Sequence, residues 1–356
     1  MRKSLLFLCL LCLVFAGCEK VRQEPAQQPA QQPTAAQAPP EVTLILGAYT
    51  VPKEAYQKEI IPAFQKYWLE KEGQKVNFEE SYIASGAQSR AIVGGFEADI
   101  AALSLEADVD RIKEAGLITH DWKSGASKGF VTRSTVAIAY REGNPKNIKD
   151  WEDLTRKDVG VLYPSPKTSG GAMWDVNAIY GAGMKLAEVK TGKPDKEAGR
   201  KLLKDVQRNV KVMDKSGRES VTTFENGIGD ALVTYENEIL LRKIQGRVIP
   251  YVVPDATILI ENPVAVVDKN VDKRQTRKVA EAFVEFLFTK DSQRAFSKYG
   301  FRSVNEDVAK EFAAEYPVPK YLFDIAYLGG WAAVEKDIYG DEGVWPKIME
   351  ELGREK

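Results

Sequence analysis

The sequence predicts an α/β fold, and three observations support this. Short β-rich runs alternate with segments in which apolar residues recur at helical spacing, an order typical of mostly parallel sheets. The chain has 356 residues, of which 44% are hydrophobic, so it can form a sizeable core and two domains of ordinary size. No repeat with a period of about 20–50 residues is visible in the main part of the chain.

The first 17 residues are predicted to be a signal peptide. A basic start is followed by an apolar run of twelve residues, Leu5 to Ala16. A bilayer core of about 30 Å needs about 20 residues, so the run fits a secretory signal better than a membrane span. Small residues before Cys18 resemble a bacterial lipoprotein signal, in which Cys18 would become the lipidated N-terminus. The alternative is a buried N-terminal helix that contains a cysteine by chance.

Residues 18–40 are predicted to be a tether. The segment is rich in Pro, Gln and Ala, and it repeats the sequence PAQQ twice in succession. It has almost nothing to bury, so we expect it to stay extended and solvated. A tether of this kind suits a protein that contacts a partner in the membrane without entering the membrane itself.

The first half of the main part is predicted to alternate strands and helices. A β-rich run begins at residue 41, and Pro52 followed by an acid marks a helix that continues to about residue 71. The elements that follow are a strand at 75–82, a helix at 87–93, a buried strand at 99–103, a helix at 107–115 and a strand at 134–140.

The second half continues the same rhythm. Strands are expected at 159–163, 231–235, 248–252 and 264–267. Helices are expected at 170–186, 196–209, 220–227 and 274–288. Beyond about residue 301 the pattern becomes helical and aromatic, and we expect those aromatic side chains to be core residues.

Composition excludes several classes of function. The chain has 50 Lys and Arg against 51 Asp and Glu, which leaves no basic excess for binding nucleic acid. Three cysteines and one histidine, His120, are too few for a typical zinc site or a catalytic triad. Adjacent acids such as Glu79 and Glu80 point to opposite faces of a strand. We therefore expect no enzyme activity, no catalytic residue, no metal and no cofactor.

Four joints between a strand and a helix carry small polar residues, at 49–52, 84–86, 165–171 and 216–218. A helix N-terminus offers free N–H groups and the positive end of the helix dipole. Ser or Thr caps such an end, and Gly lets an anion approach the backbone. Several ends that converge would bind an anion without Lys or Arg, although each joint alone could be an ordinary cap.

The third joint also carries a family resemblance. The stretch from Ser165 to Trp174, SPKTSGGAMW, resembles a motif of bacterial periplasmic sulfate-binding proteins, the receptors of sulfate ABC importers. Further similar stretches, in the family's order between about residues 42 and 331, are 143–146, 150–154, 227–230 and 235–238. The resemblance implies a two-lobed type II periplasmic-binding fold with a hinge, in which the ligand is closed between the lobes.

The resemblance also implies a set of ligand-binding residues. In the family, main-chain N–H groups, serine hydroxyls and one indole hold the dianion. The matching positions are Thr50, Ser85, Ser169, Gly170, Gly171, Gly217 and Tyr235. The family commonly has an acid at Thr50, where the backbone N–H binds, and Trp at Tyr235, where a phenol can also donate. Arg218 matches an arginine beside the site that stabilises the donors, and we expect Glu219 to face solvent.

The two lobes can be assigned from this resemblance. We expect lobe one to combine residues 41–136 with 257–356 and lobe two to be residues 137–256. The hinge would lie near 136–140 and 252–259. The C-terminal helices are expected to pack on lobe one.

The function implied is the extracytoplasmic substrate-binding component of an ABC importer, working as a monomer with a permease and its ATPase. It would lie in the periplasm or on the outer face of the cytoplasmic membrane, held there by its lipid alone. Thiosulfate, molybdate, tungstate or phosphate is the alternative ligand, and an anion sensor without a transporter is the alternative function.

Charge favours sulfate among these ligands. Phosphate carries a proton at neutral pH and can donate it in a hydrogen bond to a carboxylate of the site. Sulfate carries no proton, so it needs only hydrogen-bond donors. The matched positions contain no Asp or Glu. We therefore expect sulfate affinity to stay nearly constant from about pH 5 to 8, because Ser, Gly and Tyr do not titrate there.

Overall fold

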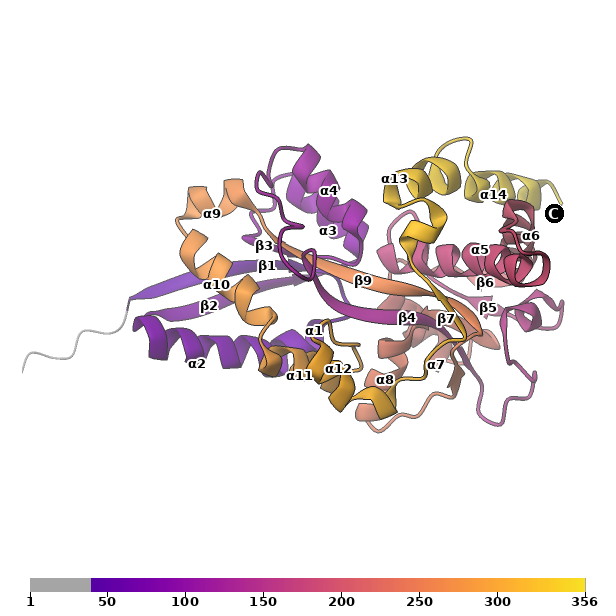
Figure 1. Ribbon diagram of the computed structural model, residues 1–356, viewed down its shortest axis with the longest axis horizontal. Coiled ribbons are helices and arrows are strands. Elements are labelled where there is room, and N and C mark those ends of the chain that lie inside the picture. Colours follow the sequence, from indigo (N-terminus) through magenta and orange to yellow (C-terminus); the bar gives the residue numbers. More distant parts are fainter. Residues whose placement is uncertain (1–39, 356) are drawn as a thin grey trace, which may run out of the picture. The chain divides into compact units, whose positions relative to one another are not determined.

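The computed structural model describes residues 40–355 (Figure 1). The predicted signal peptide, the lipidation site Cys18 and the tether as far as residue 39 lie outside the described residues. Within the described range, no helix combines the length and the apolar character needed to cross a membrane.

The described strands join in one hydrogen-bonded network in the order β2-β1-β3-β9-β4-β7-β5-β6, with β8 on β4 and β10 on β9. Their bounds are β1 (Glu41–Ala48), β2 (Lys75–Tyr82), β3 (Ile100–Ala102), β4 (Phe130–Tyr140), β5 (Val161–Leu162), β6 (Val210–Val212), β7 (Ala231–Tyr235), β8 (Tyr251–Val252), β9 (Ala256–Val266) and β10 (Tyr321–Phe323).

Two long antiparallel strands, β4 and β9, connect a first strand group (β1, β2, β3) with a second strand group (β5, β6, β7) (Figure 1). The first part of β4 pairs with β9 up to Thr135, opposite Leu259. From Val136 onward β4 pairs with β7, and the far end of β9 pairs with β3. The predicted two-lobed α/β class is confirmed. The predicted lobe boundary at 136/137 falls next to this change of partner, and the boundaries themselves stay a prediction.

The sheet is mixed, although the sequence predicts mostly parallel pairing. Strands within each group are parallel, as in the pairs β1–β2, β1–β3, β5–β6 and β5–β7. The pairs made by β4 with β7, β8 and β9, and by β9 with β3, are antiparallel. The prediction is therefore correct inside each group and wrong for the strands that link them.

The helices follow the predicted order with longer bounds in several places. They are α1 (Lys53–Ala55), η1 (Tyr56–Ile60), α2 (Ile61–Glu72), α3 (Ser85–Val93), α4 (Glu106–Glu114), η2 (Trp151–Thr155), α5 (Gly170–Thr191), α6 (Lys196–Arg208), α7 (Gly217–Glu225), α8 (Glu236–Ile244), α9 (Asp268–Arg274), α10 (Arg277–Leu287), α11 (Lys290–Lys298), α12 (Glu306–Glu311), η3 (Ala313–Glu315), η4 (Ile325–Leu328), α13 (Trp331–Val334), η5 (Glu335–Tyr339) and α14 (Val344–Arg354).

Helices cover both faces of each strand group because strand residues alternate in direction. In β1, Leu44 and Leu46 belong to the core that includes α2 and α10, whereas Ile45 belongs to the core under α3 and α4. In β4, Ile138 faces the core that includes α5 and α6, and Ala139 faces α7 and α8. Each strand end is thus held between two helical layers.

Helix α8 was not predicted as a helix because its buried face is polar. Glu236, Asn237 and Glu238 are buried, and the acids pair with arginines rather than with apolar neighbours. Apolar periodicity cannot reveal a face of this kind, since the signal it uses is the spacing of hydrophobic residues.

The C-terminal segment, from β10 to the end of α14, packs mainly against α5 and α6. The prediction that the C-terminal helices pack on lobe one is therefore wrong for this segment. Lys204 of α6 forms salt bridges of 3.0 Å with Glu351 and 2.8 Å with Glu355. The ring of Phe323 lies so close to Gly181 of α5 that a Cβ there would be 2.4 Å from it. The long helix α5 offers more apolar surface than its own segment covers, and the C-terminal segment buries it. The predicted core role of Trp331 and Trp345 is confirmed, since each is 6% exposed.

Two glycines allow α5 and α6 to cross closely. A Cβ at Gly183 would lie 2.7 Å from the carbonyl oxygen of Ala198 and 2.7 Å from the Cα of Gly199. Such distances leave no room for a side chain, so the crossing depends on glycine at this position.

We expect Gly183→Ala to lower the free energy of unfolding by about 1–3 kcal/mol, because the added methyl group overpacks this crossing. Gly353→Ala in α14 is the matched control: nothing lies within 4 Å of its Cβ position. The control should leave stability unchanged or raise it by up to about 1 kcal/mol through helix propensity. Urea unfolding of both variants measures the difference, and equal stability of the two would contradict the close crossing.

Candidate functional site

A small cavity lies where the carboxyl ends of strands from both groups meet. Open α/β sheets bind ligands at this edge, since loops and helix N-termini gather there. The cavity is lined by Tyr49, Thr50, Val51, Ala84, Ser85, Ser104, Ser169, Gly171, Asp175, Ser216, Gly217, Thr234, Tyr235 and Glu238. None of the described residues that line it is Lys, Arg or His.

The structure brings together six of the seven residues that the resemblance implies: Thr50, Ser85, Ser169, Gly171, Gly217 and Tyr235. The seventh, Gly170, lies behind them. A Cβ at Gly170 would be 2.8 Å from the Ser104 Oγ atom and 2.8 Å from the Leu105 side chain, so glycine lets α5 approach the loop after β3.

Helices α3, α5 and α7, each of nine or more residues, begin at the cavity, and so does α8, whose N-cap residue is Tyr235. Ser169 caps α5 by accepting a hydrogen bond from the Ala172 N–H at 3.3 Å, and Ser216 caps α7 in the same way from the Glu219 N–H at 3.3 Å. Because these hydroxyl groups accept inside the helix, their own protons are free to point into the cavity. The first N–H groups of each helix have no intrahelical acceptor and point the same way.

The hydroxyl group of Ser85 is already engaged. It donates to the Asp108 Oδ2 atom at 2.6 Å and accepts from the Ser104 N–H at 2.9 Å. Asp108 in turn pairs with Arg111 at 2.6 Å. At this position the backbone N–H groups that open α3, rather than the serine hydroxyl group, are therefore the donors available to a ligand.

Tyr235 shares a hydrogen bond with Ser104, whose Oγ atom lies 2.6 Å from the phenol oxygen. Two hydroxyl groups that share one hydrogen bond leave one proton free, so the pair can still donate once into the cavity. The Trp174 Nε1–H and the Asn262 side chain both donate to the Ser104 carbonyl, at 2.9 Å and 3.1 Å, and hold this loop. Burial raises the pKa of Tyr235 well above its usual value, so the phenol keeps its proton.

Arg218 lies behind the cavity, and carboxylates occupy its guanidinium group. It donates to Glu54 at 2.7 Å and 3.0 Å and to Glu238 at 2.9 Å and 3.1 Å. It also donates to the Val51 carbonyl at 3.2 Å, next to Thr50. Burial opposes its charge, but Glu238 and Glu54 raise the pKa of Arg218 above its usual value. Arg218 thus fixes the loop after β1 relative to α7 and α8.

Glu219 is exposed and accepts from the Lys215 N–H at 3.1 Å. The expectation that Glu219 faces solvent is confirmed. A carboxylate in this position stays in water and does not oppose an anion in the cavity.

Eight residues that line the cavity are not among the predicted ligand residues: Tyr49, Val51, Ala84, Ser104, Asp175, Ser216, Thr234 and Glu238. Four of them, Tyr49, Val51, Ala84 and Ser216, lie in the joints singled out from the sequence. Two of the others, Asp175 and Glu238, are acids, although the matched positions contain none. Glu238 is neutralised by Arg218 and by Arg242 at 3.2 Å. Asp175 could have been found from spacing, since it follows Gly171 by four residues and therefore shares its helix face.

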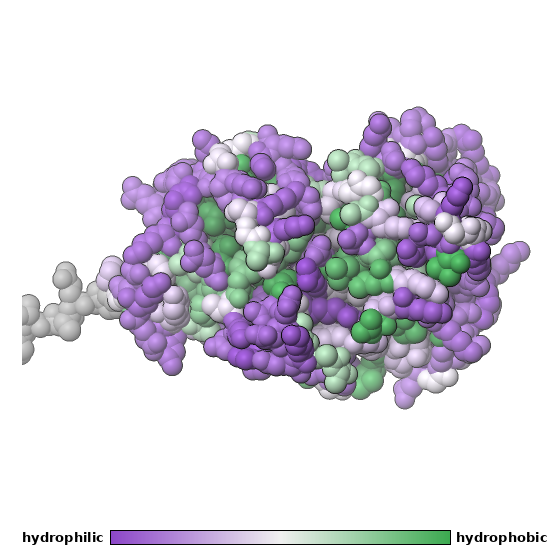
Figure 2. All heavy atoms as spheres, viewed as in Figure 1, coloured by the Kyte–Doolittle hydropathy of each residue, from purple (hydrophilic) through white to green (hydrophobic). Residues whose placement is uncertain are grey.

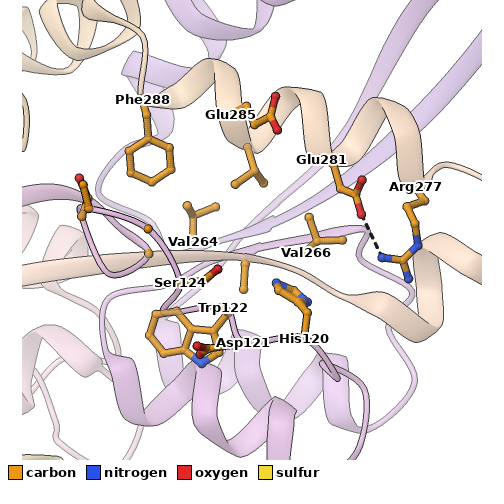
Figure 3. A pocket seen from close by; sticks show the side chains of 16 residues that line it. His120, Asp121, Trp122, Ser124, Val264, Val266, Arg277, Glu281, Glu285 and Phe288 are labelled. Carbon is orange, nitrogen blue, oxygen red and sulfur yellow. Dashed lines mark hydrogen bonds and ion pairs between the residues drawn. The ribbon is translucent and has the colours of Figure 1, made fainter.

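A larger cavity of about 640 Å³ lies elsewhere, between α10, the end of β9 and the loop that contains His120 (Figure 3). Figure 2 shows hydrophobic side chains between hydrophilic ones in the region of α10 and β9. Val264, Val266 and Phe288 line it, and its Arg277 already pairs with Glu281 at 3.1 Å and with Asp268 at 2.8 Å. No set of free donors converges there, so its size does not make it the functional site.

The small cavity offers hydrogen-bond donors rather than reactive groups. The single histidine of the chain, His120, lies in the larger cavity, so it cannot serve as a base for the serines of the small one. Among residues 40–355, no group of three or more His, Cys, Asp and Glu side chains is arranged to hold a metal ion. What the arrangement can do is bind a small anion with neutral groups.

Comparison with known proteins gives a consistent family. The family model described as bacterial extracellular solute-binding protein matches residues 44–302. A sulfate-binding protein of Synechococcus elongatus is 43% identical over 314 residues, which cover 88% of this chain and 87% of that protein. A thiosulfate-binding protein of Escherichia coli is 32% identical and covers 86% of this chain and 90% of that protein.

Comparison with solved structures supports the same family. The sulfate-binding protein SubI from Mycobacterium tuberculosis has a TM-score of 0.75 and 37% identity, and it covers 83% of this chain and 98% of its own. A periplasmic thiamin-binding protein, at 14% identity and a TM-score of 0.60, shares the fold alone. The family model, the relatives that match most of the chain, and the fold all agree. The chain therefore belongs to the bacterial extracellular solute-binding protein family.

Proposed function

We propose that this protein is the extracytoplasmic substrate-binding component of an ABC importer and that it binds sulfate in the small cavity. The observation that carries the proposal is the convergence of the N-termini of α3, α5 and α7 and of several hydroxyl groups on a cavity lined by no Lys, Arg or His among the described residues. The sulfate-binding relatives, at up to 43% identity over most of the chain, support the same ligand.

Neutral donors suit a fully ionised oxyanion, which accepts hydrogen bonds and has none to give. The N–H groups at Thr50, Ser85, Gly170, Gly171 and Gly217, with the Ser169 and Tyr235 hydroxyl groups, are the proposed donors. Each charge-assisted hydrogen bond contributes about 1.5–3 kcal/mol. Their sum exceeds the roughly 8 kcal/mol of a micromolar affinity, and the excess offsets desolvation of the dianion and closure of the site.

Thiosulfate is the second candidate ligand, because a thiosulfate-binding protein is among the long relatives. Thiosulfate has the same charge and tetrahedral shape as sulfate, so the donors do not exclude it. Molybdate, tungstate and phosphate follow as weaker candidates. Titration calorimetry of the protein with these five anions tests the proposal: micromolar binding of sulfate supports it, and absence of sulfate binding contradicts it.

We further propose that residues 41–136 and 257–320 form one lobe, and that residues 137–256 form the other together with the C-terminal segment from β10 onward, with β4 and β9 as the hinge. The ion pairs of Arg218 with Glu54 and Glu238 support this arrangement, because Glu54 belongs to the first segment and the other two to the second. From β10 onward, the C-terminal segment contacts the second lobe, so it would move with α5 and α6.

The proposed setting is the outer face of the cytoplasmic membrane or the periplasm, with a permease and its ATPase as partners. The family supports an extracytoplasmic location. The lipoprotein-like sequence before Cys18 and the tether of residues 18–40 support attachment by lipid alone. We propose that the anchored protein acts as a monomer.

Cys18→Ser tests the anchor. We expect the variant to appear as an uncleaved precursor or as a released body, because the lipid is attached through the Cys18 thiol. Fractionation and mass spectrometry measure this. An unmodified Cys18 in mature wild-type protein outside the membrane fraction contradicts the anchor.

Ser169→Ala tests the hydroxyl donors. We expect sulfate affinity to fall roughly ten- to 150-fold, which corresponds to one charge-assisted bond of about 1.5–3 kcal/mol. Ser165→Ala is the matched control, because Ser165 lies in the same loop and does not line the cavity. Calorimetry at pH 7 compares the two, and a Ser169→Ala protein that binds as well as Ser165→Ala excludes this donor.

Gly217 allows a test of a backbone donor without loss of the helix. It is the first residue of α7, where proline is favoured, and the preceding Ser216 has the extended backbone (φ −146°, ψ 159°) that proline requires before it. Gly217→Pro removes only the N–H, and Gly217→Ala keeps it, with nothing within 4 Å of the new Cβ. We expect a ten- to 150-fold loss for Pro and little change for Ala. Equal affinities in calorimetry would show that this N–H does not bind.

A further inference from the structure

Asp175 is a buried carboxyl group in the small cavity that the proposed donors do not explain. Its side chain is 1% exposed and lines the cavity. Among residues 40–355, its Oδ1 atom has no hydrogen-bond partner. Burial raises the pKa of Asp175 well above its usual value. An ionised carboxylate without a partner is costly to bury, so the neutral acid is the stable form here.

The helix geometry directs Asp175 toward the proposed anion position. Gly171 and Asp175 are four residues apart on α5, so they share a face, and helix side chains lean toward the N-terminus. Gly171 has no side chain to fill the space that Asp175 leans into. A Cβ at Gly171 would be 3.3 Å from the Ser169 Oγ atom and 3.7 Å from the Tyr235 ring, which places this face in the cavity.

Among residues 40–355, no Lys, Arg or His lines the cavity beside Asp175. Burial raises the pKa values of Tyr163, directly after β5, of Tyr235 in β7 and of Tyr339 in η5, and the nearby Asp175 raises them further. The charged groups nearby are Glu238 of α8, which pairs with Arg218 and Arg242, and Asp108 of α4, which pairs with Arg111. No described residue that lines the cavity therefore compensates a negative charge on Asp175.

We propose that Asp175 is a further ligand-binding residue of this anion site: it carries a proton while the anion is bound and donates a hydrogen bond to an anion oxygen. This inference rests on the proposed function. It ties binding of a dianion such as sulfate to the protonated state of Asp175, since the neutral acid donates to the anion and an ionised Asp175 repels it.

The proposal sets a direction for the pH dependence. The anion binds the protonated form, so full affinity is present below the pKa of Asp175 in the anion-free protein. Affinity is lost as the pH rises through that value, by about tenfold per pH unit for one linked proton. Burial keeps the pKa of Tyr49 and of Tyr235 well above the usual tyrosine value, so neither phenol titrates below pH 9.5. The pH-independence expected from the sequence is thus confined to the range below the pKa of Asp175.

The test is calorimetry of the full chain with sodium sulfate from about pH 5.5 to 9.5 at constant ionic strength. Two buffers of different ionisation enthalpy at each pH count the protons taken up. We expect affinity to fall at the alkaline end and proton uptake to rise toward one per sulfate. Asp175→Asn should bind with constant affinity and take up no proton, because an amide donates at every pH. Asp341→Asn, at an exposed site, should behave as wild type.

A second variant separates donation from packing. Asp175→Ala has no donor and adds no volume, so a loss of binding cannot come from overpacking; we expect at least tenfold weaker binding at pH 6, where Asp175→Asn still binds. Wild-type affinity and proton uptake that match Asp175→Asn over the whole range overturn the proposal, and so does an Ala variant that binds as well as Asn. Absence of sulfate binding by wild type at pH 6 would instead contradict the proposed function.

Discussion

The antiparallel pairing of β4 with β9 is the constraint on which the rest of this structure depends. Each of the two strands has eleven residues, and each pairs first with the other and then with one strand group. The pairing therefore joins the first and second strand groups through hydrogen bonds in one continuous order of strands. It brings the loops after β1 and β3 to the same place as the N-termini of α5 and α7, although both loops precede both helices by more than 60 residues in the chain.

The electrostatics of the site follow from this convergence. Arg218 follows the lining residue Gly217 and is already neutralised by Glu54 and Glu238, and Arg242 shares Glu238. A bound anion thus meets dipoles, N–H groups and hydroxyl protons rather than a net positive charge. Fixed dipoles bind without requiring that a desolvated Lys or Arg stay charged and unpaired in an otherwise neutral cavity. The ion pairs serve instead to hold the loop after β1 against α7 and α8.

Asp175 gives the cavity a feature that donors alone do not. A neutral carboxylic acid donates a hydrogen bond and loses this proton when the pH rises, whereas the N–H groups around it do not titrate. Its protonated state follows from burial without a partner rather than from any neighbouring charge. The same low polarity that strengthens the hydrogen bonds of the site therefore also keeps this acid neutral.

The sequence by itself determined the local elements and much of the site. Strand 231–235 and strand 75–82 have the predicted bounds, because strand alternation is a local property. Helix caps and glycine positions, which are also local, marked the joints, and the family resemblance implied the six ligand residues that line one cavity. Tertiary structure decided the rest. The sheet is mixed because β4 and β9 pair with antiparallel partners. Ion pairs stabilise the buried polar face of α8, and the C-terminal segment packs on the apolar surface of α5. Long-range packing also placed Ser104 against Tyr235 and, among residues 40–355, left the buried Asp175 Oδ1 atom without a hydrogen-bond partner. The spacing of neighbouring residues encodes neither result.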